Sequence, residues 1–398
     1  MKIVIASDFF YPHVNGVATF CYNLAAGLVK DGHQVMVLAP SVDRRAHTEH
    51  HHGYTIRRLP SVPLRVYPLR VALRPADEIR RALIGFQPDV MHAQSPLEVG
   101  RNSIVEARKL GIPIVSTNHA MPDNLVDNLR VLLPLKYPID RIMRLYGSYL
   151  HKKTDIITMP TQSAIDTMAG KYKADCLVVS NGIDTERFTP GAASAALRQR
   201  YNLPEGVPIA LYVGRLDGEK HLDVFVRALA IMQPSQPVHG LIVGRGTAAL
   251  QLEELAHQLG IRQHITFTGF VSDEELPQIY RLGTVFAISS PAELQSIVTL
   301  EAIATGLPVV AANAVALPEL CQPGVNGALF TTDDPESMAA ALQQILGHPA
   351  QLQQLGKASR TIALQHSFKT TLATFEKLYR QAIASRTAVA TAGSDTSA

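Results

Sequence analysis

The sequence predicts an α/β protein built from two tandem domains, each a parallel sheet wound with helices on both faces. Short continuous apolar runs, which are typical of strands buried on both faces, alternate with amphipathic stretches of helical length. The alternation is interrupted once and then restarts. The length of 398 residues also exceeds what one ordinary domain requires, so we expect two doubly wound sheets rather than one.

The first set of alternating elements covers residues 1–185. Its opening strand is an uninterrupted apolar run, and the helix that follows ends near Gly32, a residue type that commonly stops helices. The histidine-rich stretch 47–53 is interpreted as a solvated loop rather than a metal site. Strands are expected at residues 2–7, 34–40, 89–94, 113–119, 155–160 and 176–182, and helices at residues 16–33, 97–110, 139–152 and 161–171.

Residues 186–206 interrupt the pattern. They are rich in Pro, Gly and Ala and contain no long apolar strand, which indicates a linker. The alternation then resumes over residues 207–366, the second domain. Its strands are expected at 209–214, 240–246, 265–270, 285–290 and 308–313, followed by helices at 335–346 and 349–384. Residues 385–398 are small and polar and predict a disordered tail.

Composition argues against several classes of function. The formal net charge is only +3, which gives no nucleic-acid signature. The three cysteines, Cys21, Cys176 and Cys321, have no paired spacing, so we expect a reducing cytoplasm and neither disulfides nor a zinc site. The N-terminal residues do not read as a signal peptide, and no apolar run approaches the roughly 20 residues that span a bilayer.

In open α/β sheets, ligands bind outside the carboxyl ends of the strands. The segment LYVGRLDGEKH follows the first strand of the second domain and carries Gly214, Arg215 and Lys220. Two cations in a strand–loop–helix start suit a diphosphate, because side chains and backbone amides can share its charge. Two solvated surface cations are the alternative interpretation.

Two further strand ends have features that suit a flat ligand. The segment LIVGRGT contains Gly244 and Gly246 but lacks the full G-x-G-x-x-G fingerprint, so a nicotinamide dehydrogenase is poorly supported. Backbone without a Cβ can still approach a nucleobase closely, and Phe270 ends the next strand.

The segment AELQSIVTLEAIATGLPVV places two acids, Glu293 and Glu301, eight positions apart. Paired carboxylates can act as general acid and base, or they can accept hydrogen bonds from the hydroxyls of a diol. Cations for a phosphate together with acids for hydroxyls point to a nucleotide sugar. Backbone amides at the helix start, at Gln295, Ser296 and Ile297, would add anion binding.

These motifs together resemble those of the retaining glycosyltransferases of family 4, which have the GT-B fold of two Rossmann-like domains facing an interdomain cleft. The resemblance rests on G-R-x4-K followed by E-x7-E, and it extends from SDFFYPHVNGVATFCYNLAAGLVKDGH to the terminal helices. It implies that residues 181–184 form the first hinge. It also implies that a last helix, around 367–384, packs back on the first domain.

The resemblance assigns roles to the donor side. Arg215 and Lys220 would bind the diphosphate and stabilise the leaving group. Glu301 would bind the ribose hydroxyls, and Glu293 those of the transferred sugar. Backbone around Gly246 and Phe270 would frame the base.

On the acceptor side, Gly16 would form a tight loop near the phosphates, and His119 would lie near the sugar at the reaction centre. Asp8, Asn15 and Asn118 are expected close to the acceptor, although Asp8 is equally suited to capping a turn.

One departure from the family pattern concerns the segment between the two glutamates. Many relatives have E-G-F-G or E-S-F-G where this chain has Glu293-Leu294-Gln295-Ser296, which leaves the choice of donor sugar open. No D-x-D motif is present, so we expect no cofactor and no metal requirement. Cations and helix amides would stabilise the leaving group, and transfer would proceed by same-face attack through an oxocarbenium-like state.

Two basic stretches of the first domain indicate a membrane acceptor. Residues 56–81 contain seven Arg against two acids, and residues 125–153 contain six Lys or Arg against two acids, all interspersed with apolar residues. Such surfaces suit an anionic bilayer. We therefore predict hexose transfer from a UDP-glucose or GDP-mannose type of donor to a membrane glycerolipid or glycolipid, in the cytoplasm at the inner face of the plasma membrane. A soluble or cell-envelope oligosaccharide acceptor, a sugar-nucleotide epimerase and the oligomeric state stay open.

Overall fold

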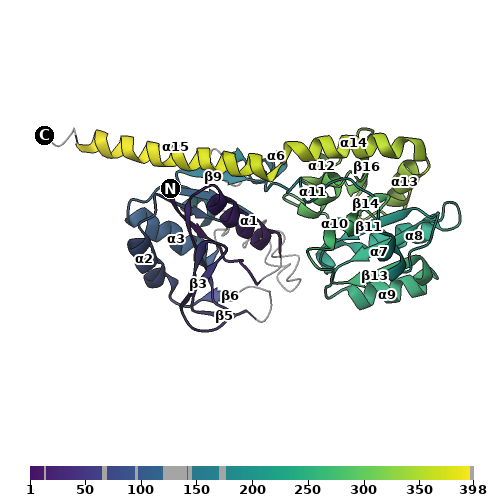
Figure 1. Ribbon diagram of the computed structural model, residues 1–398, viewed down its shortest axis with the longest axis horizontal. Helices are drawn as coiled ribbons and strands as arrows, with labels where there is room; N and C mark the ends of the chain where they lie inside the picture. The colour runs from purple at the N-terminus through teal and green to yellow at the C-terminus, as the bar shows by residue number, and fades with distance from the viewer. Residues whose placement is uncertain are drawn as a thin grey trace. The chain divides into compact units, whose positions relative to one another are not determined.

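The computed structural model describes residues 1–12, 15–64, 70–94, 97–119, 141, 146–169 and 176–394. The chain divides into two compact units (Figure 1). Unit 1 comprises Met1–Ser180 together with Thr371–Ala398, and unit 2 comprises Asn181–Thr370. The chain therefore passes between the units twice, near residue 180 and near residue 370, whereas the sequence placed the first boundary at 185.

Unit 1 contains an eight-stranded sheet with the order β10-β9-β8-β7-β1-β2-β4-β3 among the described residues. All neighbouring strands pair in parallel except β3 and β4, which are antiparallel at one edge. The strands are β1 (Lys2–Ala6), β2 (Gln34–Pro40), β3 (His47–His51), β4 (Tyr54–Leu59), β7 (Val90–Ala93), β8 (Ile114–Thr117), β9 (Ile156–Met159) and β10 (Cys176–Val178). A separate small hairpin is formed by β5 (Ser61–Pro63) and β6 (Arg70–Ala72).

Helices cover both faces of this sheet, as the strand β1 shows. Ile3 and Ile5 lie in one hydrophobic cluster, whereas Val4 and Ala6 lie in another. This alternation is the two-residue period of a strand buried on both sides. The first cluster includes residues of α1 (Gly16–Lys30) and α15 (Phe368–Ser394), and the second includes residues of α2 (Pro75–Phe86) and α3 (Glu98–Lys109). A further helix, α6 (Gln162–Ala169), connects β9 to β10.

The C-terminal helix α15 supplies part of the core of unit 1. Leu372, Phe375 and Tyr379 are buried in the same cluster as β1. Beneath them, the buried His92 has its Nδ1 2.7 Å from the Tyr379 hydroxyl and its Nε2 2.7 Å from the Thr117 hydroxyl. Burial holds the pKa of His92 well below its usual range, so the ring is neutral and both nitrogens are used in hydrogen bonds.

Two expectations for the end of the chain were wrong. The single helix predicted over 349–384 is divided at His366 and Ser367 into α14 (Pro349–Gln365) and α15. The tail predicted to be disordered over 385–398 is helical as far as Ser394, where α15 ends. Residues 395–398 lie outside the described part of the chain.

Unit 2 is a six-stranded, entirely parallel sheet with the order β13-β12-β11-β14-β15-β16. Its strands are β11 (Ile209–Val213), β12 (His239–Val243), β13 (Ile265–Gly269), β14 (Val285–Ile288), β15 (Val309–Ala312) and β16 (Gly327–Phe330), the last of which the sequence did not predict. Its helices are α7 (Ala195–Arg200), α8 (Leu222–Met232), α9 (Ala249–Gln258), α10 (Leu276–Tyr280), α11 (Ile297–Ala304), α12 (Leu317–Leu320), α13 (Pro335–Leu346) and α14, with short 3₁₀ turns η2 (Gly218–Lys220) and η3 (Arg262–His264).

The segment 186–206, expected to be a linker, instead packs on unit 2. Phe188, Leu197 and Leu203 are buried in the core of that unit. Arg360 of α14 also donates a hydrogen bond of 2.7 Å to the carbonyl oxygen of Phe188. Three apolar residues spread over a Pro- and Gly-rich segment give no periodic signal, which is why the sequence did not reveal this packing.

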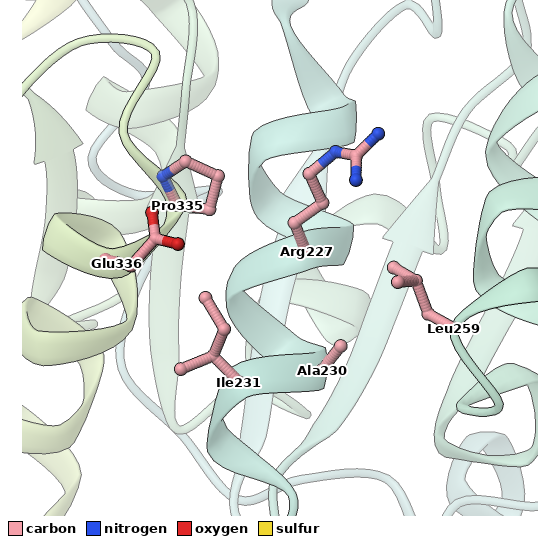
Figure 2. A pocket seen from close by; sticks show the side chains of 6 residues that line it. All are labelled: Arg227, Ala230, Ile231, Leu259, Pro335 and Glu336. Atoms are coloured by element: carbon pink, nitrogen blue, oxygen red, sulfur yellow. The ribbon is translucent and has the colours of Figure 1, made fainter.

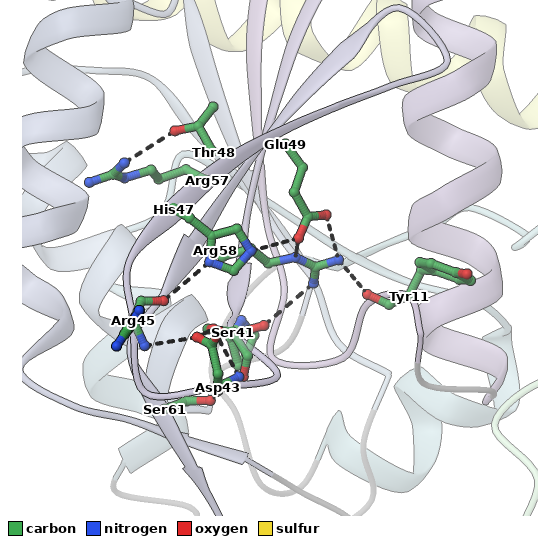
Figure 3. Close-up of polar contacts among 11 residues, drawn as sticks. Tyr11, Ser41, Asp43, Arg45, His47, Thr48, Glu49, Arg57, Arg58 and Ser61 are labelled. Carbon is green, nitrogen blue, oxygen red and sulfur yellow. Dashed lines mark hydrogen bonds and ion pairs between the residues drawn. The ribbon is translucent and has the colours of Figure 1, made fainter.

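The histidine-rich stretch 47–53, expected to be a solvated loop, forms the edge strand β3 and the turn into β4. Figure 3 shows why it is held there: the nearly buried Arg58 of β4 reaches both carboxylate oxygens of Glu49 and donates to the carbonyl oxygen of Tyr11 at 2.7 Å. His47 completes the group, with Nε2 2.8 Å from Glu49. An ion pair between the buried Arg58 and the partly exposed Glu49 therefore helps to fix a strand whose sequence is too polar to indicate one.

Several of the arginines expected to form a basic surface over residues 56–81 are instead paired within unit 1. Arg57 and Arg81 both pair with Glu78, and Arg58 pairs with Glu49. Arg70 donates to the Ser61 hydroxyl at 2.8 Å. Residues 65–69, and most of the second basic stretch, 125–153, lie outside the described residues.

We expect Tyr379→Phe to lower the free energy of unfolding by about 1–2 kcal/mol, because it leaves one nitrogen of the buried His92 without its hydrogen bond. Lys377→Ala, on the exposed face of the same helix, should change it by less than about 0.5 kcal/mol. Urea unfolding monitored by circular dichroism measures both. Equal stabilities for the two variants would show that the contact does not stabilise unit 1.

Candidate functional site

The strand order of unit 2 reverses between β11 and β14, since β12 and β13 lie on one side of this pair and β15 and β16 on the other. Ligands of open parallel sheets bind at the carboxyl ends of the strands beside such a reversal. The loop after β11 carries Arg215 and Lys220, and the loop after β14 carries Glu293. The topology of this unit therefore brings together three residues that the sequence selected separately.

Lys220 and Glu293 form the contact between these two loops. The Nζ of Lys220 lies 2.8 Å from Oε1 of Glu293, and both side chains are less than one-fifth exposed. Burial acts to lower the pKa of Lys220, but the charge and hydrogen bond of Glu293 outweigh it and the pKa is raised. Lys220 is therefore a charged ammonium at neutral pH.

Arg215 is the more accessible cation, with 45% of its side chain exposed. Its guanidinium pairs with Asp217 and with Glu219, which lies 3.6 Å from Lys220. Asp217 in turn accepts a hydrogen bond from the backbone nitrogen of Thr247 at 3.0 Å, in the loop after β12. The two acids hold the guanidinium in place beside the ammonium.

Glu301 lies deeper, on α11, and is 9% exposed. Tyr280, the last residue of α10, donates a hydrogen bond of 2.6 Å from its hydroxyl to Oε2 of Glu301. Burial raises the pKa of Glu301 to about 7, although the Tyr280 hydrogen bond opposes the shift. A carboxyl group in this state gains from any ligand whose hydroxyls donate to its ionised form.

The residues between the two acids use their side chains within unit 2. Gln295 accepts a hydrogen bond of 2.7 Å from the backbone nitrogen of Asn181. Ser296 is the N-cap of α11, and its hydroxyl accepts from the backbone nitrogen of Thr299 at 3.2 Å. Ile297 is the first helical residue. The helix start at which the sequence predicts anion binding is therefore regularly capped.

The three glycines of unit 2 that were predicted at the donor site are also required by the local backbone. A Cβ on Gly244 would lie 1.8 Å from the carbonyl oxygen of Gly214, and one on Gly246 would lie 2.3 Å from the backbone of Leu216. Gly214 and Gly244 also have φ values of 150° and 138°. The loops after β11 and β12 can therefore approach each other only where side chains are absent.

Phe270 is 60% exposed after β13, and the Arg245 guanidinium lies 5.7 Å from the centre of its ring. Phe270 thus offers an accessible aromatic surface with the Arg245 cation beside it. The loop after β12, which carries Arg245, contacts the loop after β11, which carries Arg215 and Lys220. The exposed ring suits the face of a nucleobase.

The predicted residues of unit 1 lie after β1, at the start of α1 and after β8. His119, after β8, has its Nε2 2.9 Å from Oε1 of Gln94, which follows β7. The ring of Phe20 lies 5.1 Å from the imidazole. Burial lowers the pKa of His119 to about 3, so the imidazole is neutral. Asn118 is buried beside it, and its backbone nitrogen donates to Thr158.

Asp8 and Asn15 both act as helix caps. The two carboxylate oxygens of Asp8 accept from the backbone nitrogens of Val99, at 2.7 Å, and Gly100, at 3.1 Å, at the start of α3. Burial raises the pKa of Asp8 to about 7 against these hydrogen bonds. Asn15 accepts from the backbone nitrogen of Ala18 at 2.8 Å, and Gly16 begins α1. The Asp8 carboxylate therefore caps a helix start rather than a turn, and its predicted contact with the acceptor stays a prediction.

A pocket of about 340 Å³ lies elsewhere on unit 2, between α8 and the start of α13. Figure 2 shows the side chains that line it, and none is a residue predicted for the site: Arg227, Ala230, Ile231, Leu259, Pro335 and Glu336. Among the described residues, no group of three or more His, Cys, Asp or Glu is arranged to hold a metal ion. Within the same part of the chain, no helix has the length and apolar character needed to cross a membrane.

Sequence reasoning missed the partners of the selected residues. Glu219 stands four positions after Arg215, but this spacing favours ion pairs on helices and Arg215 lies in a loop, so it gave no signal. Tyr280 and Gln94 had none either, because they lie 21 and 25 positions from Glu301 and His119 and meet them only in the folded unit.

Two family models match the chain. The model described as "Glycosyltransferase Family 4" matches residues 14–187, and the model described as "Glycosyl transferases group 1" matches residues 194–362.

Three curated relatives are similar over most of their length. A D-inositol 3-phosphate glycosyltransferase of Xylanimonas cellulosilytica is 31% identical over 75% of this chain and 73% of its own. A GDP-mannose-dependent alpha-mannosyltransferase of Mycobacterium tuberculosis is 29% identical over 84% and 85%. An alpha-monoglucosyldiacylglycerol synthase of Streptococcus pneumoniae is 26% identical over 88% and 79%.

The structure is also similar to that of a sucrose-phosphate synthase from Thermosynechococcus elongatus. The TM-score is 0.79, with 96% of this chain and 99% of that chain covered. The sequence identity is 21%, so the similarity concerns the fold alone.

We expect Gly244→Ala to destabilise unit 2 by about 3 kcal/mol or more, because its Cβ would meet backbone and its φ is unfavourable for alanine. Gly218→Ala is the matched control, since its Cβ would meet nothing within 4 Å, and it should stay within about 1 kcal/mol of wild type. Thermal unfolding measures both. A Gly244→Ala variant as stable as wild type would contradict the close approach of the two loops.

Proposed function

The chain belongs to glycosyltransferase family 4 and has the GT-B fold, and on this premise we propose that it transfers a hexose from a nucleotide sugar to an acceptor hydroxyl with retention of configuration. The observation that carries the proposal is the Lys220–Glu293 pair with Arg215 beside it, at the reversal of strand order in unit 2. Cations for a diphosphate and an acid for hydroxyls meet there on two adjacent strand ends.

We propose that Arg215 and Lys220 bind the diphosphate and stabilise it as the leaving group. Lys220 is a charged donor whose side chain is largely buried and held by Glu293, which favours electrostatic stabilisation without reorganisation at the moment of reaction. Arg215 adds a planar guanidinium that can bind two phosphate oxygens at once. A diphosphate would have to exchange with Asp217 and Glu219 for this guanidinium.

Glu293 and Glu301 are proposed as hydroxyl acceptors rather than as an acid–base pair. The carboxylate of Glu293 is held by Lys220, which orients an oxygen toward a sugar bound at the same loop. Glu301 keeps one oxygen on Tyr280, and the other can accept from ribose hydroxyls. The exposed ring of Phe270 would carry the base.

We propose same-face transfer through an oxocarbenium-like state without a metal. Lys220, Arg215 and the amides at the start of α11 supply the positive charge that a leaving diphosphate needs. The leaving phosphate would then help to deprotonate the acceptor hydroxyl. His119, neutral and held by Gln94, would act as a hydrogen-bonding group beside the sugar rather than as a cation.

A membrane lipid is the acceptor we propose. The alpha-monoglucosyldiacylglycerol synthase of Streptococcus pneumoniae is named for a lipid product, and it shares most of its length with this chain. Exposed Leu64, Leu73 and Arg74 flank the small hairpin β5–β6, which gives unit 1 a surface of mixed apolar and basic character. The protein would then work from the cytoplasm at the inner face of the membrane.

The test is an assay of the full chain with GDP-mannose and UDP-glucose, each offered to diacylglycerol in anionic vesicles and to water-soluble sugars, in EDTA. Transfer to lipid with retained anomeric configuration supports the proposal. Transfer only to soluble sugars, a strict need for added Mg²⁺, or inversion would each overturn the corresponding part of it. Consumption of the donor with no acceptor at all would favour an epimerase or a hydrolase.

We expect Lys220→Ala to lower kcat/KM for the preferred donor by at least about 100-fold, since it removes a preorganised charge at the leaving group. Lys357→Ala, an exposed lysine on α14, is the matched control and should keep wild-type activity. Circular dichroism verifies that both variants fold. Turnover within a few-fold of wild type in Lys220→Ala would remove this residue from the donor site.

We expect Glu301→Gln to have opposite effects on stability and on nucleotide binding. A carboxyl whose folded pKa is raised to about 7 contributes stability below pH 4.5 that is lost as the pH rises through 7, by about 3 kcal/mol in all. The amide carries no such loss, so the variant should gain stability relative to wild type between pH 5 and pH 8.

Binding of the matching nucleoside diphosphate should weaken about tenfold in the same variant, because ribose loses an ionised acceptor. Chemical unfolding at the two pH values and calorimetric titration measure the pair of effects. Glu254→Gln, on the exposed face of α9, is the control for both. A variant that binds nucleotide as well as wild type would remove Glu301 from the ribose site.

A further inference from the structure

Gln295 lies in the loop of the proposed donor site, yet its side chain is directed to another part of unit 2. It stands two positions after Glu293 and is 7% exposed. Its Oε1 accepts a hydrogen bond of 2.7 Å from the backbone nitrogen of Asn181, which is 114 positions earlier in the chain. Asn181 is the first residue of unit 2, at the point where the chain leaves unit 1.

The bond defines how the amide of Gln295 is turned. A backbone N–H can only donate, so the group that faces it must be the side-chain oxygen. An aromatic side chain, which the family pattern has at this position, offers no such acceptor. The departure from that pattern therefore creates a contact between the donor loop and the crossover that an aromatic residue could not make.

The backbone after Asn181 is paired independently of the donor loop. Ile183 donates to the carbonyl oxygen of His366 at 2.9 Å and accepts from the nitrogen of Phe368 at 2.9 Å. These bonds join the first crossover to the segment that precedes the second. Between them and unit 1, Gly182 has a φ of 76°, a conformation that favours glycine.

The conformation of Asn181 includes one unfavourable feature, a buried side-chain oxygen without a donor. Its side chain is buried, and its Oδ1 has no hydrogen-bond partner among the described residues. A buried acceptor without a donor is unfavourable, so the local contacts of Asn181 do not by themselves favour this conformation. The bond to Gln295 leaves that oxygen as it is, but it gives the backbone nitrogen of the same residue an acceptor.

We propose that Gln295 is a positioning residue that couples the donor-sugar loop to the first crossover of the chain. Occupation of the loop by a nucleotide sugar adjusts Glu293, and Gln295 transmits the change to the backbone of Asn181. In the reverse direction, the crossover helps to hold Glu293 where the sugar binds. The identity of the ligand in this inference rests on the proposed function. The hydrogen bond between Gln295 and Asn181 is independent of that function.

The proposal is tested first in the free protein by amide hydrogen exchange at single-residue resolution. In Gln295→Leu, which keeps side-chain bulk without the oxygen, the Asn181 amide should exchange at least tenfold faster. The Ile183 amide is the internal control and should exchange as in wild type, because its acceptor is His366. Gln295→Glu, which keeps an acceptor oxygen, and Gln258→Leu, on the exposed face of α9, should leave Asn181 protected.

The second arm adds GDP, UDP, GDP-mannose and UDP-glucose. The donor sugar should slow exchange at Asn181 in wild type and not in Gln295→Leu. Turnover should fall at least tenfold in that variant, while affinity for the matching nucleoside diphosphate changes less than twofold. Equal protection of Asn181 in Gln295→Leu and wild type, or the same response to donor in both, would overturn the proposal.

The experiments distinguish a failure of the proposed function from a failure of the positioning role of Gln295. A wild-type protein that binds none of the four nucleotides would overturn the proposed function, and with it the coupling to a donor. Exchange in the free protein would still decide whether Gln295 holds the crossover. Faster exchange at Ile183 as well as Asn181 in Gln295→Leu would indicate a general loss of packing and would also count against a positioning role.

Discussion

The ion pair between Lys220 and Glu293 is the interaction on which the arrangement of unit 2 around its strand ends depends. It joins loops from the two strands, β11 and β14, at which the sheet reverses its order. With the ammonium charged and largely buried, either partner alone would be an unfavourable buried charge. The neighbouring features of the region have partners of their own. Asp217 and Glu219 orient Arg215, Ser296 caps α11, and Tyr280 donates to the buried carboxyl of Glu301.

How much the sequence could predict depends on the kind of signal each element has. Strands such as β1 and β11 are continuous apolar runs because they are buried on both faces, and their prediction is confirmed. The edge strand β3 was missed because an ion pair stabilises it rather than apolar burial. Segment 186–206 was misjudged because its three buried residues have no period.

The candidate site divides in the same way. Residues whose chemistry and spacing form a motif, Arg215, Lys220, Glu293 and Glu301, could be selected from the sequence, and three of them meet at one strand reversal. Their partners could not, because Tyr280 approaches Glu301 only through the packing of α10 on α11. Nor could the sequence show that Gln295 turns to the crossover, since that direction depends on where residue 181 lies in the folded unit.

The return of α15 to unit 1 has a consequence for how the protein is made. Unit 2 is complete once residue 370 has been synthesised, but the first cluster of unit 1 still lacks Leu372, Phe375 and Tyr379 at that stage. During translation, the N-terminal sheet therefore emerges first and finishes its core last. The part of its apolar face that α15 covers stays exposed while the whole second unit is produced, although α1 is already present. A ribosome-bound or prematurely terminated chain would expose that face, whereas unit 2 would already be closed.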